Sequence, residues 1–392
     1  MNIEKIDVFS ILDSRGWPTL AGSLMLEDGK KVYASVPSGS SVGKYEAVEK
    51  RDADKDNYSG QSVEGVVLSF KDKIIPVLLG QKPDLERIDK ELIELDGTGN
   101  KSNLGANVTL LASVLVAKAQ ALTLNVEVFE FIAHVAGFKP AMPLVRANVI
   151  NGGKHADSGL AFQEFMIQML PGTSFEDQQH SIVSLYHKLA EALQLQSLSA
   201  CVGDEGGFAP RFGDKGMFGN ERAALTLLSE VVECAGMAGK VNICLDVAAS
   251  EFYDEKYKTY NVYGEHVFAE DLIQFYSDLV SQYPIVSIED GLVQDDWEGW
   301  QSLTEKLGKN VQIVADDLCV TKTTRIQKAI EENACNAFLI KPNQVGTVSE
   351  TLAAITLAKS SGCGVVPSHR SGETNDSFIA DFAIGIAADA CK

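Results

Sequence analysis

The spacing of apolar and polar residues divides the chain into two regions with different periodicities. In the first region, strand-type runs cover residues 3–11, 18–26 and 31–36. Asp28-Gly29 separates the last two runs and is typical of a hairpin turn. Apolar residues at helical spacing follow, over residues 62–79, 83–95 and 107–121. This order predicts an α+β domain over residues 1–136.

A change of pattern follows residues 137–143, a segment with two prolines and one glycine that we interpret as a linker. Over residues 144–392, short apolar strands alternate with helices. The clearest strands are residues 241–247, 285–289, 311–316, 337–341 and 364–369, and helices are expected over residues 270–282, 321–332 and 348–360. Such alternation is the signature of an α/β fold with a parallel sheet, either a β/α barrel or a doubly wound sheet.

Each of these strands is apolar until it ends in a charged or imidazole side chain: Asp246, Glu289, Asp316, Lys341 and His369. In a β/α barrel the carboxyl ends of the strands open onto one face, so these side chains would converge. Any one acid alone could be a solvated strand end or a helix cap. Three acids on successive strands would repel one another without a cation, and carboxylate oxygens suit Mg²⁺. The pattern therefore predicts a metal site of three carboxylates.

Two further groups at these strand ends suggest chemistry. Beside a metal, the pKa of the Lys341 ammonium should fall, which would free an amine to act as a general base. Lys341 could instead merely form an ion pair with Asp316. Arg370 and Ser371 follow His369, and a guanidinium is a good receptor for phosphate or carboxylate.

Three glycine-containing segments supply weaker candidates. Glu205 lies between glycines in residues 202–210, which suits a loop that holds an acid over a ligand, although a bare turn is the alternative. His155 and Glu164 are nine residues apart across a loop and a strand. Residues 38–45 are rich in Gly and Ser and are interpreted as a lid over the barrel mouth, or as a plain surface turn.

Composition narrows the class of ligand. The chain has 392 residues, and 34 Lys and Arg against 54 Asp and Glu give a net charge of −20, so nucleic acid and anionic membranes are poor partners.

The seven cysteines form no C-x-x-C pair, and the amino terminus carries no basic segment followed by an apolar one. We therefore expect a cytoplasmic protein. The apolar residues 108–126 are interrupted by polar side chains and predict a core helix rather than a membrane span.

The motifs together resemble those of a known family. The matching segments are residues 13–16, 38–43, 151–164, 203–210, 245–253, 287–291, 315–318, 340–346 and 368–373. Nearly the whole chain thereby resembles enolase, the glycolytic phosphopyruvate hydratase. The resemblance implies an enolase-type β/α barrel with an N-terminal α+β capping domain, and a homodimer or higher homo-oligomer. It also implies a small phosphorylated carboxylate as the substrate.

Roles follow from the resemblance position by position. It implies that Asp246, Glu289 and Asp316 hold one Mg²⁺ and that Ser41 contributes to a second. Lys341 would remove the C2 proton of 2-phosphoglycerate, and Glu205, supported by Glu164, would help to expel the C3 hydroxyl. The implied substrate contacts are His155, His369, Arg370 and Ser371. Sites of the enolase superfamily are known to combine a Lys or His base with one or two Mg²⁺.

The carboxyl-terminal end departs from the family pattern. Members usually continue through a last barrel strand and a long helix, so we expect both to be missing here. By register Lys392 falls on a substrate-binding lysine of the family, although the residues before it do not match. Two alternatives to an active enolase remain: a catalytically weak paralog that serves as a binding or scaffold protein, and another carboxylate dehydratase of the same superfamily.

Overall fold

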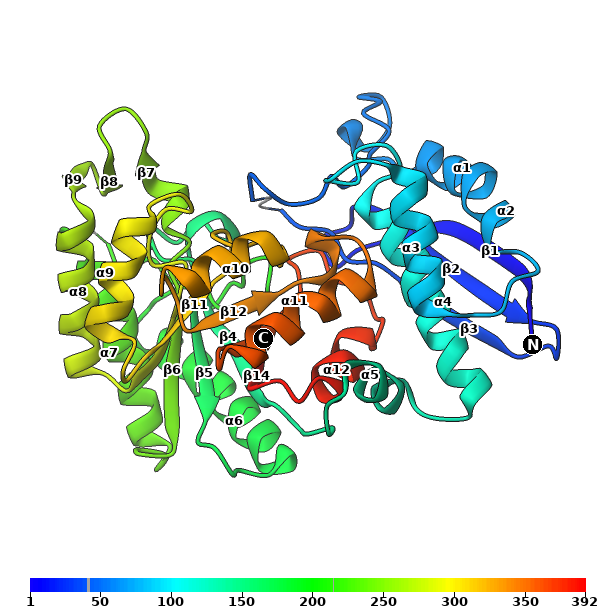
Figure 1. Ribbon diagram of the computed structural model, residues 1–392. Helices are drawn as coiled ribbons and strands as arrows, with labels where there is room; N and C mark the ends of the chain where they lie inside the picture. The colour runs from blue at the N-terminus through cyan, green and yellow to red at the C-terminus, as the bar shows by residue number, and fades with distance from the viewer. Residues whose placement is uncertain (41–42, 214) are drawn as a thin grey trace.

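The computed structural model describes residues 1–40, 43–213 and 215–392 and begins with a three-stranded antiparallel sheet (Figure 1). Its strands are β1 (Ile3–Leu12), β2 (Pro18–Leu26) and β3 (Lys31–Ser35). The turn between β2 and β3 contains Gly29, whose φ of +82° is a left-handed conformation that glycine adopts without strain. The predicted hairpin is confirmed.

Helices cover this sheet: α1 (Glu64–Lys73), α2 (Ile75–Leu78), α3 (Leu85–Asp96), α4 (Ala106–Leu124) and α5 (Val128–Ala136). The single helix predicted over residues 62–79 is divided into α1 and α2. Pro76 lies in the first turn of α2, where its ring cannot continue a preceding helix. α4 is long and apolar enough to cross a membrane, yet 72% of its most apolar window is buried, and it packs on β2 and β3 as a core helix.

Residues 137–143 lead from α5 into an eight-stranded sheet, whose order is β13-β12-β11-β10-β6-β5-β4-β14. The strands are β4 (Leu144–Asn151), β5 (Glu164–Met169), β6 (Val241–Asp246), β10 (Ile285–Glu289), β11 (Gln312–Ala315), β12 (Ala337–Ile340), β13 (Gly364–Pro367) and β14 (Ala390–Cys391). β5 is antiparallel to both β4 and β6, whereas the other paired strands are parallel. The five strands predicted for the parallel sheet, β6 and β10 to β13, are all parallel, which confirms that prediction; β5 was not among them.

The expectation that the last barrel strand is missing is wrong. β14 pairs with β4 in parallel, with Ala390 opposite Leu144. On its other side the Lys392 N–H donates to the Pro367 carbonyl at 3.0 Å, and the His369 N–H donates to the Lys392 carbonyl at 3.0 Å. These bonds connect β14 to β13 as well, so this two-residue strand closes the ring between the first and last strands.

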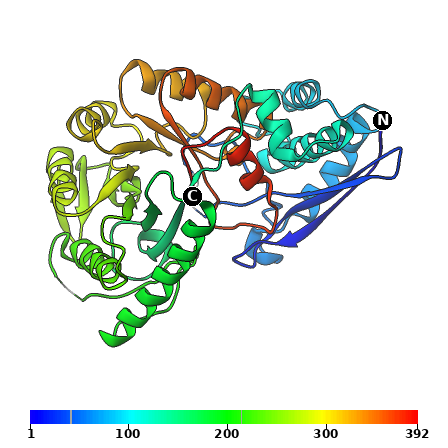
Figure 2. The same cartoon turned by 90° about the horizontal axis from the view of Figure 1, so that it is seen from below.

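Helices surround the barrel on the outside, as Figure 2 shows for the segments coloured green to orange. They are α6 (Phe175–Leu195), α7 (Gly219–Cys234), α8 (Ala269–Gln282), α9 (Trp297–Leu307), α10 (Thr323–Glu331), α11 (Val348–Ser360) and α12 (Phe378–Gly385). α12 packs against α5 of the amino-terminal region. Along the chain, β6 and α8 are separated by a small antiparallel sheet of β7 (Tyr253–Asp254), β8 (Thr259–Val262) and β9 (Glu265–Val267).

Two hydrophobic layers explain why the barrel strands are apolar at nearly every position. Val314, Leu339 and Val366 belong to a small cluster with Ala337 and Ala390, separate from the main core. Their neighbours along the strands, such as Ile313 and Phe338, belong to the main core that the helices share. Both faces of each strand are therefore buried, which is why these strands read as continuous apolar runs.

Candidate active site

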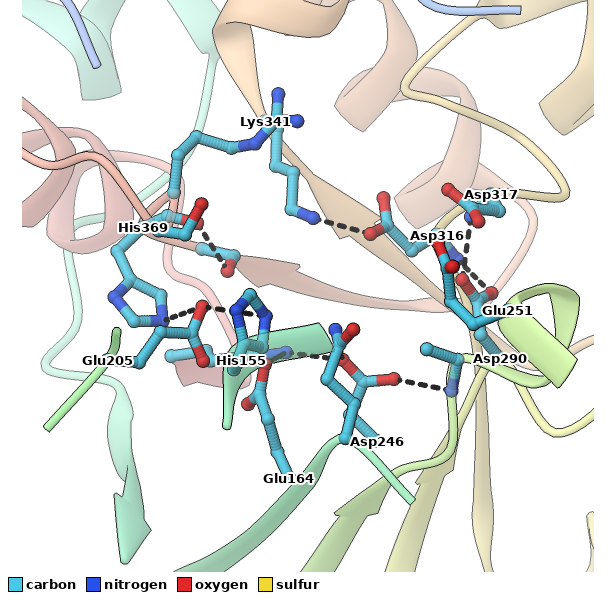
Figure 3. Close-up of a pocket in the computed structure, with 16 residues that line it drawn as sticks. His155, Glu164, Glu205, Asp246, Glu251, Asp290, Asp316, Asp317, Lys341 and His369 are labelled. Carbon is cyan, nitrogen blue, oxygen red and sulfur yellow. Dashed lines mark hydrogen bonds and ion pairs between the residues drawn. The ribbon is translucent and has the colours of Figure 1, made fainter. Parts of the chain in front are cut away.

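Side chains from distant parts of the barrel region, residues 155 to 392, meet at one mouth of the barrel (Figure 3). The predicted site residues that line it are His155, Glu164, Glu205, Asp246, Asp316, Lys341, His369, Arg370, Ser371 and Lys392. Glu289 does not line the mouth itself; it is 2% exposed and accepts a hydrogen bond at 3.0 Å from Lys392, which does line it. Ser41, the predicted contributor to a second metal, lies outside the described residues. Apart from Glu289, the mouth thus collects every predicted residue that the structure describes.

The reversed direction of β5 explains how Glu164 reaches this mouth. Glu164 is the first residue of β5 and lies opposite Asp246, the last residue of β6. In a strand parallel to its neighbours, the first residue would lie at the other end of the barrel. The antiparallel β5 therefore adds a carboxyl group to a mouth otherwise formed by strand carboxyl ends.

Lys341 forms an ion pair with Asp316, with Nζ and Oδ2 2.5 Å apart. Burial by itself lowers the pKa of Lys341, but the Asp316 carboxylate outweighs burial and the pKa is raised. The same contact lowers the pKa of Asp316 against the effect of burial. The expected fall in the Lys341 pKa is therefore not found while Asp316 is its partner, and Lys341 is protonated in this arrangement.

Lys392 supplies a second ammonium group, and it lies among three acids. Its Nζ is 3.0 Å from Glu164, 3.1 Å from Asp246 and 3.0 Å from Glu289. Burial opposes the charge on Lys392, yet these carboxylates raise its pKa well above the ordinary value. Burial and the nearby Asp246 in turn raise the pKa of Glu289 to about 8. Because the pKa of Glu289 is about 8, this acid is largely protonated at neutral pH, and Lys392 offsets the charge of the acids that remain ionised.

Glycines let the Glu205 loop approach the segment that carries His155. A Cβ atom at Gly203 would lie 2.5 Å from the His155 carbonyl oxygen, and one at Gly207 would lie 2.9 Å from Asn151 Oδ1. Gly207 instead donates its N–H to Asn151 Oδ1 at 3.0 Å. The loop is therefore held at a distance that only glycine permits. The interpretation of residues 202–210 as a bare turn does not account for these contacts.

Glu205 lies between two imidazoles, with Oε1 3.4 Å from His155 Nε2 and 3.7 Å from His369 Nε2 (Figure 3). Burial would raise the pKa of Glu205, but its electrostatic interactions with His369 and His155 hold it at about 2. Burial lowers the pKa of His369 to about 4. The raised pKa expected for Glu205 as a proton donor is therefore not found in this arrangement.

Glu164 has the opposite shift from Glu205. Burial first, and then repulsion from Glu205, raise the pKa of Glu164 well above its ordinary value. Two carboxyl groups that repel each other in a buried site share one proton, and here that proton resides on Glu164.

Sequence reasoning missed two acids that organise the mouth. Asp290 accepts hydrogen bonds from the backbone N–H groups of Asp316 and Asp317, each at 3.0 Å. Burial, followed by repulsion from Asp317, raises the pKa of Asp290 well above its ordinary value. The second acid is Asp317. Asp290 directly follows Glu289 and Asp317 directly follows Asp316, so a pair of adjacent acids at two successive strand ends is the sequence signal that could have identified them.

The amino-terminal region reaches the mouth through Arg370. Glu46 forms a buried ion pair with the Arg370 guanidinium at 3.0 Å, and Asn343 Oδ1 accepts a further bond from it at 2.8 Å. Ser371 Oγ accepts a hydrogen bond from the Ser40 N–H at 2.9 Å. The sequence contained no signal for Glu46, because its partner is 324 residues away.

The donor set fits a hard divalent cation. Asp246, Glu289 and Asp316 are buried carboxylates, and such oxygens are the ligands that Mg²⁺ prefers. Gln163 Oε1 is buried without a hydrogen-bond partner among the described residues, while its Nε2 donates to Asp246. The ligand atoms that lie within 4.8 Å of one another belong to two other groups: His155 with Glu164 and Glu205, and Asp290 with Asp316 and Asp317. Asp316 belongs to the predicted set and to the second of these groups.

The closed barrel carries its ionisable groups at the mouth formed by the strand carboxyl ends, and a separate α+β region borders it; this is the architecture of β/α-barrel enzymes. Family models match both parts of the chain: "Enolase, N-terminal domain" over residues 3–132 and "Enolase, C-terminal TIM barrel domain" over residues 139–392. A curated relative named Enolase, from Anaplasma phagocytophilum (strain HZ), is 46% identical over 387 residues, which cover 98% of this chain and 88% of the relative. The chain belongs to the enolase family.

Proposed function

We propose that this protein catalyses the reversible dehydration of 2-phosphoglycerate to phosphoenolpyruvate and water, with two Mg²⁺ as cofactors. The observation that carries the proposal is the meeting of Lys341 with the Glu164–Glu205 pair at one mouth. The reaction removes a proton from C2 and a hydroxide from C3, so it needs a base and an acid at the same substrate. An amine and a shared carboxyl proton supply these two groups.

Lys341 is the base in this proposal. The proton α to a carboxylate is weakly acidic, and its transfer to Nζ leaves the electron pair of the C2–H bond on the substrate. Lys341 can accept the proton only as a neutral amine, so the influence of Asp316 on its pKa has to be weakened first. A divalent ion held by Asp246, Glu289 and Asp316 would neutralise these carboxylates and stabilise the negative charge that develops on the substrate carboxylate.

The Glu164–Glu205 pair is the acid. When the C3–O bond breaks, the shared proton goes to the departing hydroxide and forms water, and the C2 electron pair completes the C2=C3 double bond. Hydroxide is a poor leaving group, so this proton is required. His155 and His369 hold Glu205 from two sides, and the bond from Asn148 Nδ2 to Glu205 Oε2 at 3.0 Å fixes its orientation.

The remaining contacts bind the substrate. Arg370 and Ser371 lie at the phosphate end, where a guanidinium and a hydroxyl donate to phosphate oxygens. Glu46 and Asn343 hold the guanidinium in place. Lys392 adds a positive charge near the reacting carboxylate. By family resemblance the protein is a homodimer or higher homo-oligomer, and we propose a cytoplasmic location.

The rise in absorbance from phosphoenolpyruvate, measured after adding 2-phosphoglycerate to the purified protein, tests this function. We expect turnover with Mg²⁺ and none with excess chelator. A folded protein that binds Mg²⁺ without turnover would contradict the proposal and support the non-catalytic paralog. Turnover of another hydroxy carboxylate but not of 2-phosphoglycerate would instead support a different dehydratase.

A further inference from the structure

A second cavity of about 700 Å³ lies at the end of the barrel opposite the mouth. Arg146 of β4 and Gln168 of β5 are register partners in its wall, whereas Asn151 and Glu164 of the same two strands pair at the mouth. Gln312 at the start of β11 lines the cavity as well. Nothing in the proposed reaction uses this cavity.

Arg146 spans the barrel interior and is only 6% exposed. Its guanidinium donates to Gln168 Oε1 at 2.8 Å, to Ser287 Oγ at 3.0 Å and to Gln312 Oε1 at 2.6 Å. All three acceptors are uncharged. Among the residues that the structure describes, no carboxylate forms an ion pair with Arg146. The positive charge is therefore buried without a counter-ion in contact.

A buried charge without a partner is costly, and buried charges are normally paired. A guanidinium has five N–H donors, and the three bonds leave donors for a further acceptor. Because Arg146 lines an open cavity, such an acceptor can come from solution. A planar guanidinium binds oxyanions in preference to other ligands, since its donors match two oxygens at once.

Some charges near the cavity favour the binding of an anion and others oppose it. α6 begins at Phe175, so the positive end of its dipole faces the cavity, but Glu176 and Asp177 in its first turn oppose an anion. Asp389 also lines the cavity, and its Oδ2 accepts a bond from the Val365 N–H at 2.8 Å. The guanidinium, rather than the helix terminus, is therefore the recognition group.

We propose that this cavity binds a small oxyanion of the phosphate or carboxylate class on Arg146. The site is separate from the reaction mouth and would hold its ligand at the opposite end of the barrel. Its ligand is therefore an accessory anion and not the reacting substrate.

Calorimetric titration with inorganic phosphate tests the site. The titration is done on an Arg370→Met protein, so that phosphate cannot be bound by the proposed contact at the mouth. We expect saturable binding that Arg146→Met, added to this background, weakens by about tenfold or more. A parallel titration with acetate separates phosphate from carboxylate as the preferred class. Absent binding to the Arg370→Met protein, or unchanged binding after Arg146→Met, would overturn the proposal.

Gln312→Glu gives a second test that does not depend on the folding of Arg146→Met. It places a carboxylate at the acceptor of Arg146 Nη2, so it should raise the melting temperature and abolish phosphate binding. Gln282→Glu on α8 is the matched control. Gln282 Oε1 also accepts a hydrogen bond from an arginine, Arg222, at 3.1 Å, but it does not line the cavity. A Gln312→Glu protein that binds phosphate as before would show that Arg146 does not hold the anion.

Discussion

The protonation states of single residues at the mouth depend on the charged groups that face them. Asp316 keeps Lys341 protonated, and Glu164 keeps a proton that Glu205 has lost. The different protonation states of the two glutamates do not follow from the residue type, since an isolated glutamate is fully charged at neutral pH. Any change that neutralises Asp316 acts on Lys341 as well, which couples the metal ligands to the base.

Lys341→Ala should lower kcat for phosphoenolpyruvate formation by roughly 10²- to 10⁴-fold, the range for loss of a general base. The fold should persist, because Asp316 retains the hydrogen bond from Gln344 Nε2 at 2.8 Å. Steady-state kinetics and circular dichroism measure the two effects. Lys90→Ala, on the exposed face of α3, is the matched control. Full activity in Lys341→Ala would remove Lys341 from the mechanism.

At this scale the sequence predicted which residues gather at the mouth but not their partners or their pKa shifts. Asp246, Glu289 and Lys341 were visible because each ends an apolar run. The position of Lys392 among three acids was not, since it depends on how β14 closes the barrel. Glu46 could not be linked to Arg370 for the same reason: the contact is purely tertiary.

Among the elements, the start of α11 is held by the amino-terminal region. The Val348 N–H donates to Ser113 Oγ of α4, and the Ser349 N–H donates to Asp89 Oδ2 of α3, each at 2.9 Å. The first N–H groups of a helix have no partner within the helix. Side chains of α3 and α4, in the amino-terminal region, accept these hydrogen bonds, so these two helices fix the start of α11 in the barrel.

Asp89→Asn should change the pH dependence of stability. Burial raises the pKa of Asp89 to about 6, although the bonds from Ser113 and Ser349 oppose the shift. Because the folded pKa lies above the ordinary value of 3.8, the folded state holds the proton more tightly. The resulting stability is fully present below pH 3.8 and is lost as pH rises through about 6. The loss amounts to roughly 2–3 kcal/mol.

Urea unfolding at pH 4.5 and pH 7.5 measures this effect, with the wild type and Asp89→Asn compared at both pH values. We expect the free energy of unfolding of Asp89→Asn, relative to the wild type, to be higher at pH 7.5 than at pH 4.5. An equal difference between the two proteins at both pH values would show that Asp89 does not titrate with a raised pKa.

Elements were predictable where a local pattern defined them. The strands β6 and β10 to β13 and the helices α8, α10 and α11 lie within about two residues of their predicted bounds. The reversal of β5 and the two-residue β14 could not be read locally, because direction and pairing depend on neighbouring strands. Pro76 is the local signal for the break between α1 and α2, which apolar periodicity alone does not reveal.

For the whole molecule, the mouth lies where the two regions of the chain meet. Ser38 and Gly372 exchange backbone hydrogen bonds, and Lys118 of α4 pairs with Asp376 at 2.6 Å. The capping region therefore closes one side of an acidic site in a protein with a net charge of −20. A phosphorylated, doubly acidic substrate can approach such a site only if local cations offset this charge.

Mg²⁺ should stabilise the folded protein by more than an ionic-strength effect. A cation that binds only the folded state adds about 2.7 kcal/mol when its free concentration is about 100 times Kd. Thermal unfolding with Mg²⁺, with NaCl at equal ionic strength and with chelator measures the shift. Glu289→Gln should lose most of the Mg²⁺-dependent rise in melting temperature. An equal rise with NaCl would argue against a specific cation site.

The most direct test of the proposed mechanism is hydrogen exchange at C2 of 2-phosphoglycerate, followed by NMR in D₂O with Mg²⁺. Glu205→Gln should still exchange the C2 proton while forming little phosphoenolpyruvate, because the base is intact and the acid is impaired. Lys341→Ala should neither exchange nor eliminate. Exchange at the wild-type rate in Lys341→Ala would contradict the assignment of base and acid to the two sides of the mouth.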